Sequence, residues 1–131
     1  MNPEQAHLLR QAQESFRSAR LLANQGRYDL AASRARDVMF SVAEAILAGQ
    51  SLAFARRAEI AATFREQLKE TGLVPAELAH RLAEVADAPA PSGDFGLTLR
   101  DNALEQLDHA ERFLALARRL VGPVPDDAER A

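Results

Sequence analysis

"SRARDVMFSVAEAILAG", residues 33–49, decides the fold class of this chain. Its apolar residues recur at three- and four-residue steps, which is the spacing of one face of an α-helix. Met39, Phe40 and Leu47 widen that face. A helix with such a wide apolar face is buried on more than one side. The stretch therefore predicts a central helix in an all-α protein.

The composition is that of a globular protein with one core. The chain has 131 residues, of which 47% are hydrophobic and 27% charged, and this fits a single domain. No apolar run approaches the ~20 residues of a membrane span, and the first residues lack the pattern of a signal peptide. The absence of cysteine excludes disulfides and thiolate chemistry. We therefore expect a cytoplasmic protein that does not associate with membranes.

The same helical spacing extends over most of the chain. No stretch shows sustained alternation of apolar and polar residues, so no strand is predicted. Five helices joined by short loops predict an antiparallel up-and-down bundle. We expect this bundle at residues 1–121 and a flexible, proline-broken tail at 122–131. The predicted helices span residues 3–24, 28–48, 53–70, about 75–88 and about 98–121.

The predicted third helix has an apolar stripe with small residues in it. Its expected core positions are Phe54, Ala58, Ala61, Ala62, Phe64 and Leu68.

Five segments in a fixed order carry a family resemblance. They are "NQGRYDLAASRARDVMF" from residue 24, "AEAIL" from 43, "KETGLVPAEL" from 69, "SGDFG" from 92 and "ALEQLDHAERFL" from 103. In this order they resemble the HEPN domain family, and within it short stand-alone chains whose second helix reads like "ASRAYYAMF". The resemblance covers roughly residues 6–120. It implies a HEPN-like helix bundle that pairs with itself or with a partner, such as a nucleotidyltransferase-type protein or an antitoxin.

The resemblance also implies a polar site near the pairing groove. Active members cut RNA without a metal, with an arginine that holds phosphate and a histidine that does the acid–base chemistry. The related short chains more often carry Arg-x-x-x-Asp-Tyr before the last helix and a histidine early in the third. This chain keeps Asp94 but has Ala90 and Phe95 at the arginine and tyrosine positions, and Arg57 at the histidine position. We therefore expect no catalytic residues of the family's kind.

The polar residues at the matched positions form the candidate binding groove. They are Arg34, Arg36, Asp37, Arg57 and Asp94. Together they predict a cluster that binds an anion or a partner. The structural alternative is a pairing of Arg34 with Asp94, or of Arg57 with Asp37, that fixes a loop to a helix, and such ion pairs are commoner than binding sites.

The sequence gives no support to a metal or cofactor site. Glu77 and His80 form a single Glu-x-x-His motif, whereas the di-iron helix bundles need two such motifs and two further glutamates. We interpret His80 as a surface residue and predict no metal and no cofactor.

These observations predict a catalytically degenerate helical association module. We expect a homodimer, because of the wide apolar face of residues 28–48 and the resemblance, or a complex with an operon partner such as a nucleotidyltransferase-type protein. The alternative is a divergent, metal-independent HEPN ribonuclease toxin of a toxin–antitoxin system. RNA or a nucleotide stays open as a ligand, although the net charge of −3 gives no general attraction to phosphates.

Overall fold

The computed structural model describes residues 1–49, 56–87 and 99–124. These residues form five α-helices and no strand, so the predicted all-α fold of about five helices is confirmed. The first two helices span the predicted residues, and the third begins at Arg57, with residues 53–55 of the prediction outside the described ranges. The helices are α1 (Pro3–Asn24), α2 (Tyr28–Ala48), α3 (Arg57–Thr71), α4 (Ala76–Asp87) and α5 (Leu99–Leu120).

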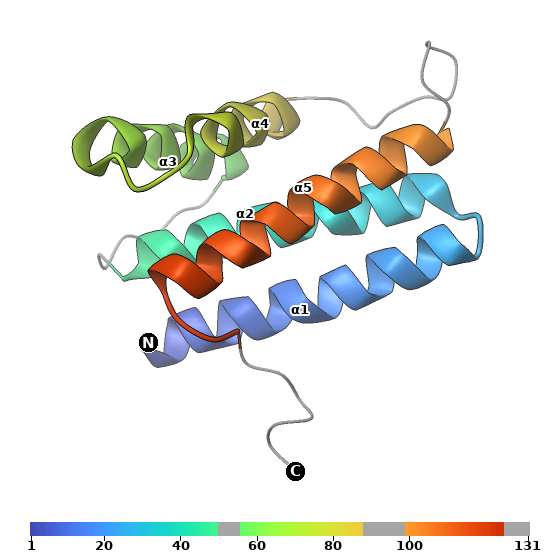
Figure 1. Ribbon diagram of the computed structural model, residues 1–131, viewed down its shortest axis with the longest axis horizontal. Coiled ribbons are helices and arrows are strands. Elements are labelled where there is room, and N and C mark those ends of the chain that lie inside the picture. The colour runs from blue at the N-terminus through green and yellow to red at the C-terminus, as the bar shows by residue number, and fades with distance from the viewer. Residues whose placement is uncertain (50–55, 88–98, 125–131) are drawn as a thin grey trace.

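The three longest helices lie side by side and the two short ones cover one side of them (Figure 1). Helix α1 runs antiparallel to α2, and α5 packs on both while running antiparallel to α1 (Figure 1). Helices α3 and α4 form an antiparallel hairpin above α2 and α5 (Figure 1). This arrangement places the start of α3 next to α2 and leaves the outer side of α1 and α5 uncovered by the rest of the described chain.

Small side chains bring α1 and α2 together. Ala31, Ala35 and Ala45 on α2 are completely buried, and the missing side-chain bulk allows close approach of the neighbouring helices. Pro3 stands at the first helical position of α1, where its missing N–H costs no hydrogen bond. Gly26 has a φ of 79° in the turn that follows α1, which is the left-handed conformation that glycine adopts without strain.

The start of α1 is fastened to the end of α2 by Gln5. This side chain is only 8% exposed, and its Nε2 donates a hydrogen bond of 3.0 Å to the carbonyl oxygen of Ala45. Its Oε1 accepts from the backbone nitrogen of Asn2 at 3.0 Å, while the Asn2 side chain accepts from the Gln5 nitrogen at 2.7 Å. This reciprocal capping box satisfies two backbone donors at the helix start.

Two stacked rings join the α3–α4 hairpin to α5. The ring centroids of Phe64 and Phe113 lie 5.9 Å apart, and both side chains are completely buried. The predicted core stripe of α3 was partly wrong, because Ala58 and Ala62 are exposed while Ala61 and Phe64 are buried. Helix α3 covers the core from outside, so a narrower part of its surface is buried than the sequence suggested. Phe54 lies outside the described residues.

The end of α5 leads into the predicted tail. Val124 is partly buried against the core, and residues 125–131 lie outside the described ranges, so the flexible tail stays a prediction. None of the described helices combines the length and the apolar composition that crossing a membrane requires.

Candidate polar site at the start of α3

A charged cluster lies where α3 begins beside the middle of α2. The guanidinium Nη2 of Arg57, the first residue of α3, donates a hydrogen bond of 2.5 Å to Oδ1 of Asp37. On the other side, Nη1 of Arg34 lies 3.7 Å from Oδ2 of the same carboxylate. The fold thus brings Arg34, Asp37 and Arg57 together, and the Arg57–Asp37 pair is the one that the sequence offered as the structural alternative.

An aromatic ring holds Arg57 from a second direction. The guanidinium carbon lies 4.6 Å from the centroid of the Phe40 ring, which is within the range of a cation–π interaction. Phe40 is only 3% exposed, so the ring is a fixed support. Sequence reasoning placed Phe40 in the core, which is correct, but missed its contact with Arg57.

Arg36 adds a third positive charge to the cluster. Its side chain is half-buried, and this burial, followed by repulsion from Arg57, lowers the pKa of Arg36, while Asp37 acts in the opposite direction. An arginine nevertheless stays protonated at any physiological pH. In the described part of the cluster, three guanidiniums therefore share the single carboxylate of Asp37, and this excess positive charge favours an anion such as a phosphate or a carboxylate.

The fifth predicted residue, Asp94, lies outside the described residues, as do Ala90 and Phe95. The predicted pairing of Arg34 with Asp94 is therefore not tested. Arg34 has an ionic contact with Asp37.

A row of buried polar side chains on α5 was missed by the sequence analysis. His109 is 6% exposed and Gln106 is 9% exposed. Within the described part of the chain, Nδ1 of His109, Oε1 of Gln106 and Nδ2 of Asn102 are buried without a hydrogen-bond partner. Positions 102, 106, 109 and 113 are three or four residues apart, so their spacing could have revealed a second inward face of α5.

The surroundings of His109 disfavour its charged form. Burial, and next the charge of Arg81, lowers the pKa of His109, with Arg112 adding to the effect. Glu105 and Asp108 act in the opposite direction but do not cancel it. His109 is therefore neutral at pH 7.

Comparison with known proteins assigns this arrangement of helices to a family. The family model of the HEPN domain matches residues 5–121. This chain belongs to the HEPN domain family. It is also 32% identical over 96 residues to UPF0332 protein glr0978 of Gloeobacter violaceus, a match that covers 73% of this chain and 75% of that protein. The resemblance read from the sequence is thereby confirmed.

The Glu-x-x-His motif of this HEPN domain is engaged in ion pairs. Glu77 lies 2.6 Å from Arg112 on α5, and Nε2 of His80 lies 3.1 Å from Glu84. The His80 side chain is 75% exposed, which agrees with its interpretation as a surface residue. Across residues 1–49, 56–87 and 99–124, no three histidine, aspartate or glutamate side chains converge in a way that would hold a metal ion.

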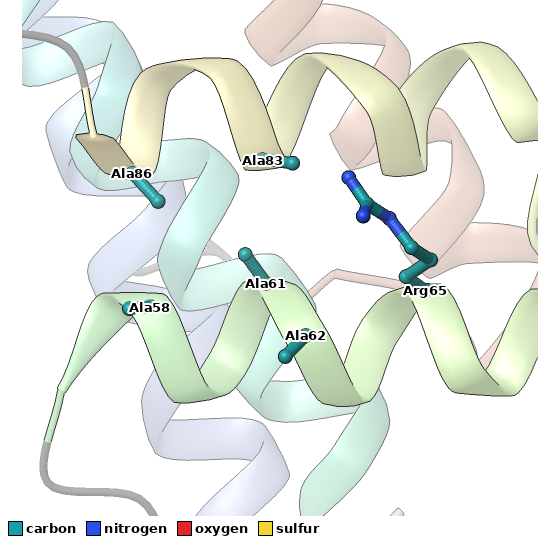
Figure 2. Close-up of a pocket in the computed structure, with 6 residues that line it drawn as sticks. All are labelled: Ala58, Ala61, Ala62, Arg65, Ala83 and Ala86. Carbon is teal, nitrogen blue, oxygen red and sulfur yellow. The ribbon is translucent and has the colours of Figure 1, made fainter.

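A separate hollow of about 170 Å³ lies between α3 and α4 of the HEPN domain. Arg65 projects from α3 toward α4 at one end of it, and methyl groups from both helices line the rest (Figure 2). Its lining contains no residue of the charged cluster, so the two features are distinct. The lining residues are Ala58, Ala61, Ala62, Arg65, Ala83 and Ala86.

Proposed function

We propose that this HEPN domain is a helical association module that has lost the RNA-cleaving chemistry of active family members. It acts as a homodimer, or with an operon-encoded partner such as a nucleotidyltransferase-type protein. The observation that carries the proposal is the pairing of Asp37. Its carboxylate accepts a hydrogen bond of 2.5 Å from Arg57 and lies 3.7 Å from Arg34.

Cleavage of RNA at the ribose 2′-hydroxyl needs one group that takes a proton and another that protonates the leaving oxygen. Arg34, Arg36 and Arg57 remain protonated and cannot act as bases. Asp37 is held by the guanidinium of Arg57, and its function in the cluster is to fix that guanidinium. The cluster is suited to bind an anion or an acidic surface without transforming it.

The first experiment tests for chemistry. Purified protein is incubated with single-stranded and structured RNA in the presence of a chelator, beside an Asp94→Ala variant. We expect no cleavage by either protein. Cleavage by the wild type that the variant loses would contradict the loss of catalysis.

The second experiment tests for association. The chain is co-expressed with the product of the adjacent gene, with a tag on one protein, and the oligomeric state of the purified chain is measured by sedimentation. We expect a homodimer or a copurifying partner. A 14.3 kDa monomer that retains no partner would overturn the proposal.

A divergent ribonuclease toxin is the second candidate, and His109 is the observation that favours it. This histidine is neutral, and the charges of Arg81 and Arg112 act on it, so it has the character of a general base beside two cationic side chains. Its 6% exposure argues against direct contact with RNA. Metal-independent cleavage and growth arrest that His109→Gln removes, in a protein that still folds, would establish this alternative over the first.

A further inference from the structure

Three polar side chains lie in a row along one inward face of α5. They are Asn102, Gln106 and His109, at steps of four and three residues. His109 is 6% exposed, Gln106 is 9% exposed and Asn102 is partly buried. In the part of the chain that the structure describes, Nδ2 of Asn102, Oε1 of Gln106 and Nδ1 of His109 have no hydrogen-bond partner. Because a buried polar atom without a partner is costly, these three atoms need partners that the described chain does not supply.

We propose that this α5 polar row, made of Asn102, Gln106 and His109, binds water inside the protein. One molecule lies between Asn102 and Gln106, and a second lies between Gln106 and His109. Together they form a file that connects buried His109 with the solvent at partly exposed Asn102. This inference is independent of the proposed association function, because it needs neither a partner nor RNA.

The first argument is distance. Side chains three or four residues apart on a helix have Cβ atoms about 5–6 Å apart. They also lean toward the N-terminus of the helix, so Gln106 leans toward Asn102 and His109 leans toward Gln106. A water molecule with hydrogen bonds of ~2.8 Å on two sides joins polar atoms up to about 5.5 Å apart. The spacing along α5 therefore allows one shared water to serve each neighbouring pair.

The second argument is the order of donors and acceptors. Nδ2 of Asn102 only donates, whereas Oε1 of Gln106 only accepts, through two lone pairs. A water between them accepts from Asn102 and donates to Gln106. A second water donates to the other lone pair of Gln106 and keeps both a proton and lone pairs for Nδ1 of neutral His109, whichever tautomer the ring adopts. Each position therefore fits a molecule that both donates and accepts.

The third argument is charge. An ion in a buried site needs an opposite charge close to it, since an isolated buried charge is very costly. The charged groups that act on His109 are two arginines and two carboxylates, and they already face one another. Arg81 lies 3.7 Å from Glu105, and Arg112 lies 3.2 Å from Asp108. A neutral molecule therefore fits the α5 polar row better than an ion does.

The two ends of the row differ in their access to solvent. Beyond His109 the same face continues with Phe113, which is completely buried and whose ring centroid lies 5.9 Å from that of Phe64. Asn102, at the other end, is partly exposed. Water therefore reaches His109 from the Asn102 end. Buried waters of this kind commonly make about three hydrogen bonds to polar groups that have no other partner.

The first test detects the water in the unchanged protein. NMR measures the transfer of magnetisation from water to the side-chain amide protons of Asn102 and Gln106 and to the ring protons of His109. We expect a transfer with the sign of a long-lived, bound water. Gln11, an exposed glutamine of α1, is the control and should show only surface water that exchanges rapidly. The absence of long-lived water at Gln106 would overturn the proposal.

The second test uses a substitution whose effect has opposite signs in a hydrated and a dry row. Gln106→Met keeps the length of the side chain but removes both bridges, so it should raise the equilibrium constant of unfolding by at least about fivefold. In a dry row the same substitution removes an unsatisfied buried group and should lower that constant, which would contradict bound water. Gln11→Met is the matched control and should change it by less than about threefold.

The third test asks whether the two waters form one file. Asn102 and His109 lie about 10 Å apart along the helix axis at 1.5 Å per residue, and substitutions so far apart ordinarily have additive effects. If the waters connect them, the effect of His109→Leu on the equilibrium constant of unfolding should change by at least about threefold in the Asn102→Leu background. Additive effects would overturn the continuous file from His109 to Asn102.

Discussion

Arg57 donates a hydrogen bond of 2.5 Å to Asp37 and so joins the first residue of α3 to the middle of α2, twenty residues earlier in the chain. Their side chains are 49% and 30% exposed, so water weakens the attraction. We predict a coupling free energy of at most about 1 kcal/mol between Asp37→Ala and Arg57→Ala in a double-mutant cycle of chemical denaturation. The Arg56–Glu59 pair, at 76% and 41% exposure, is the matched control and should couple less.

A coupling of zero at Asp37 would mean that the pair adds no stability, and the charges would then be available for binding alone. A coupling well above that of the control fits a pair that positions α3.

The hydrogen bonds of Gln5 with Asn2 and with the Ala45 carbonyl oxygen give a second prediction. Gln5→Ala removes the hydrogen bond to the carbonyl oxygen of Ala45 and half of the capping box with Asn2. Since the buried carbonyl then loses a partner, we expect a loss of about 1–2 kcal/mol in the free energy of unfolding. Gln11→Ala, at an exposed position of the same helix, should change it by less than about 0.5 kcal/mol. Equal losses of stability for Gln5→Ala and Gln11→Ala would show that the hydrogen bonds of Gln5 do not stabilise the fold.

The sequence predicted α1 and α2 to the residue because local signals agree with the packing there. Pro3 and Gly26 mark the two ends of α1, and the apolar stripe of α2 is buried as expected. The stripe of α3 was predicted less well, since alanine fits both a core and a surface position. Ala58 and Ala62 are exposed and line the hollow between α3 and α4.

The candidate site was predictable in its residue types and only partly in its contacts. The resemblance placed Arg34, Asp37 and Arg57 in one groove, but the support of Arg57 by the Phe40 ring depends on how α3 sits on α2. The burial of His109 was missed because the sequence analysis assigned the buried face of α5 from its apolar residues, such as Ala103 and Ala110. The polar residues on a second buried face of the helix were not considered. Whether such a face is buried depends on the helices that pack against it. The periodicity of one helix carries no information about those neighbours.

A third prediction concerns the core between α1, α2 and α5. Val42 is completely buried in the middle of α2, so Val42→Asp would place an unpaired carboxylate in the core, at a cost of several kcal/mol. We expect no folded protein by circular dichroism and no cooperative melting. The control is Leu30→Asp on the same helix, where the leucine is 50% exposed and folding should be retained. A cooperative melt for Val42→Asp would show that the site tolerates a carboxylate.

The last prediction is a loss of stability on mild acidification that depends on His109. Because burial lowers the pKa of His109 below its ordinary value of 6.5, the unfolded chain binds a proton at a higher pH than the folded chain does. The contribution of neutral His109 to the free energy of unfolding is therefore fully present above pH 6.5. It is lost as the pH falls from 6.5 toward the lowered pKa of His109 in the folded protein. The pKa of Glu44 is raised above 4.5 by burial and then by Glu4, so the contribution of Glu44 to the free energy of unfolding increases as the pH falls, opposite to that of His109.

The measurement compares melting temperatures at pH 7.5 and 5.5 for the wild type, for His109→Leu and for His7→Gln, an exposed control. The contribution of Glu44 is common to all three proteins, so we expect His109→Leu to lose less melting temperature than the wild type over this range, and His7→Gln to follow the wild type. An unchanged difference between pH 7.5 and 5.5 in His109→Leu would show that His109 is not the group that senses pH.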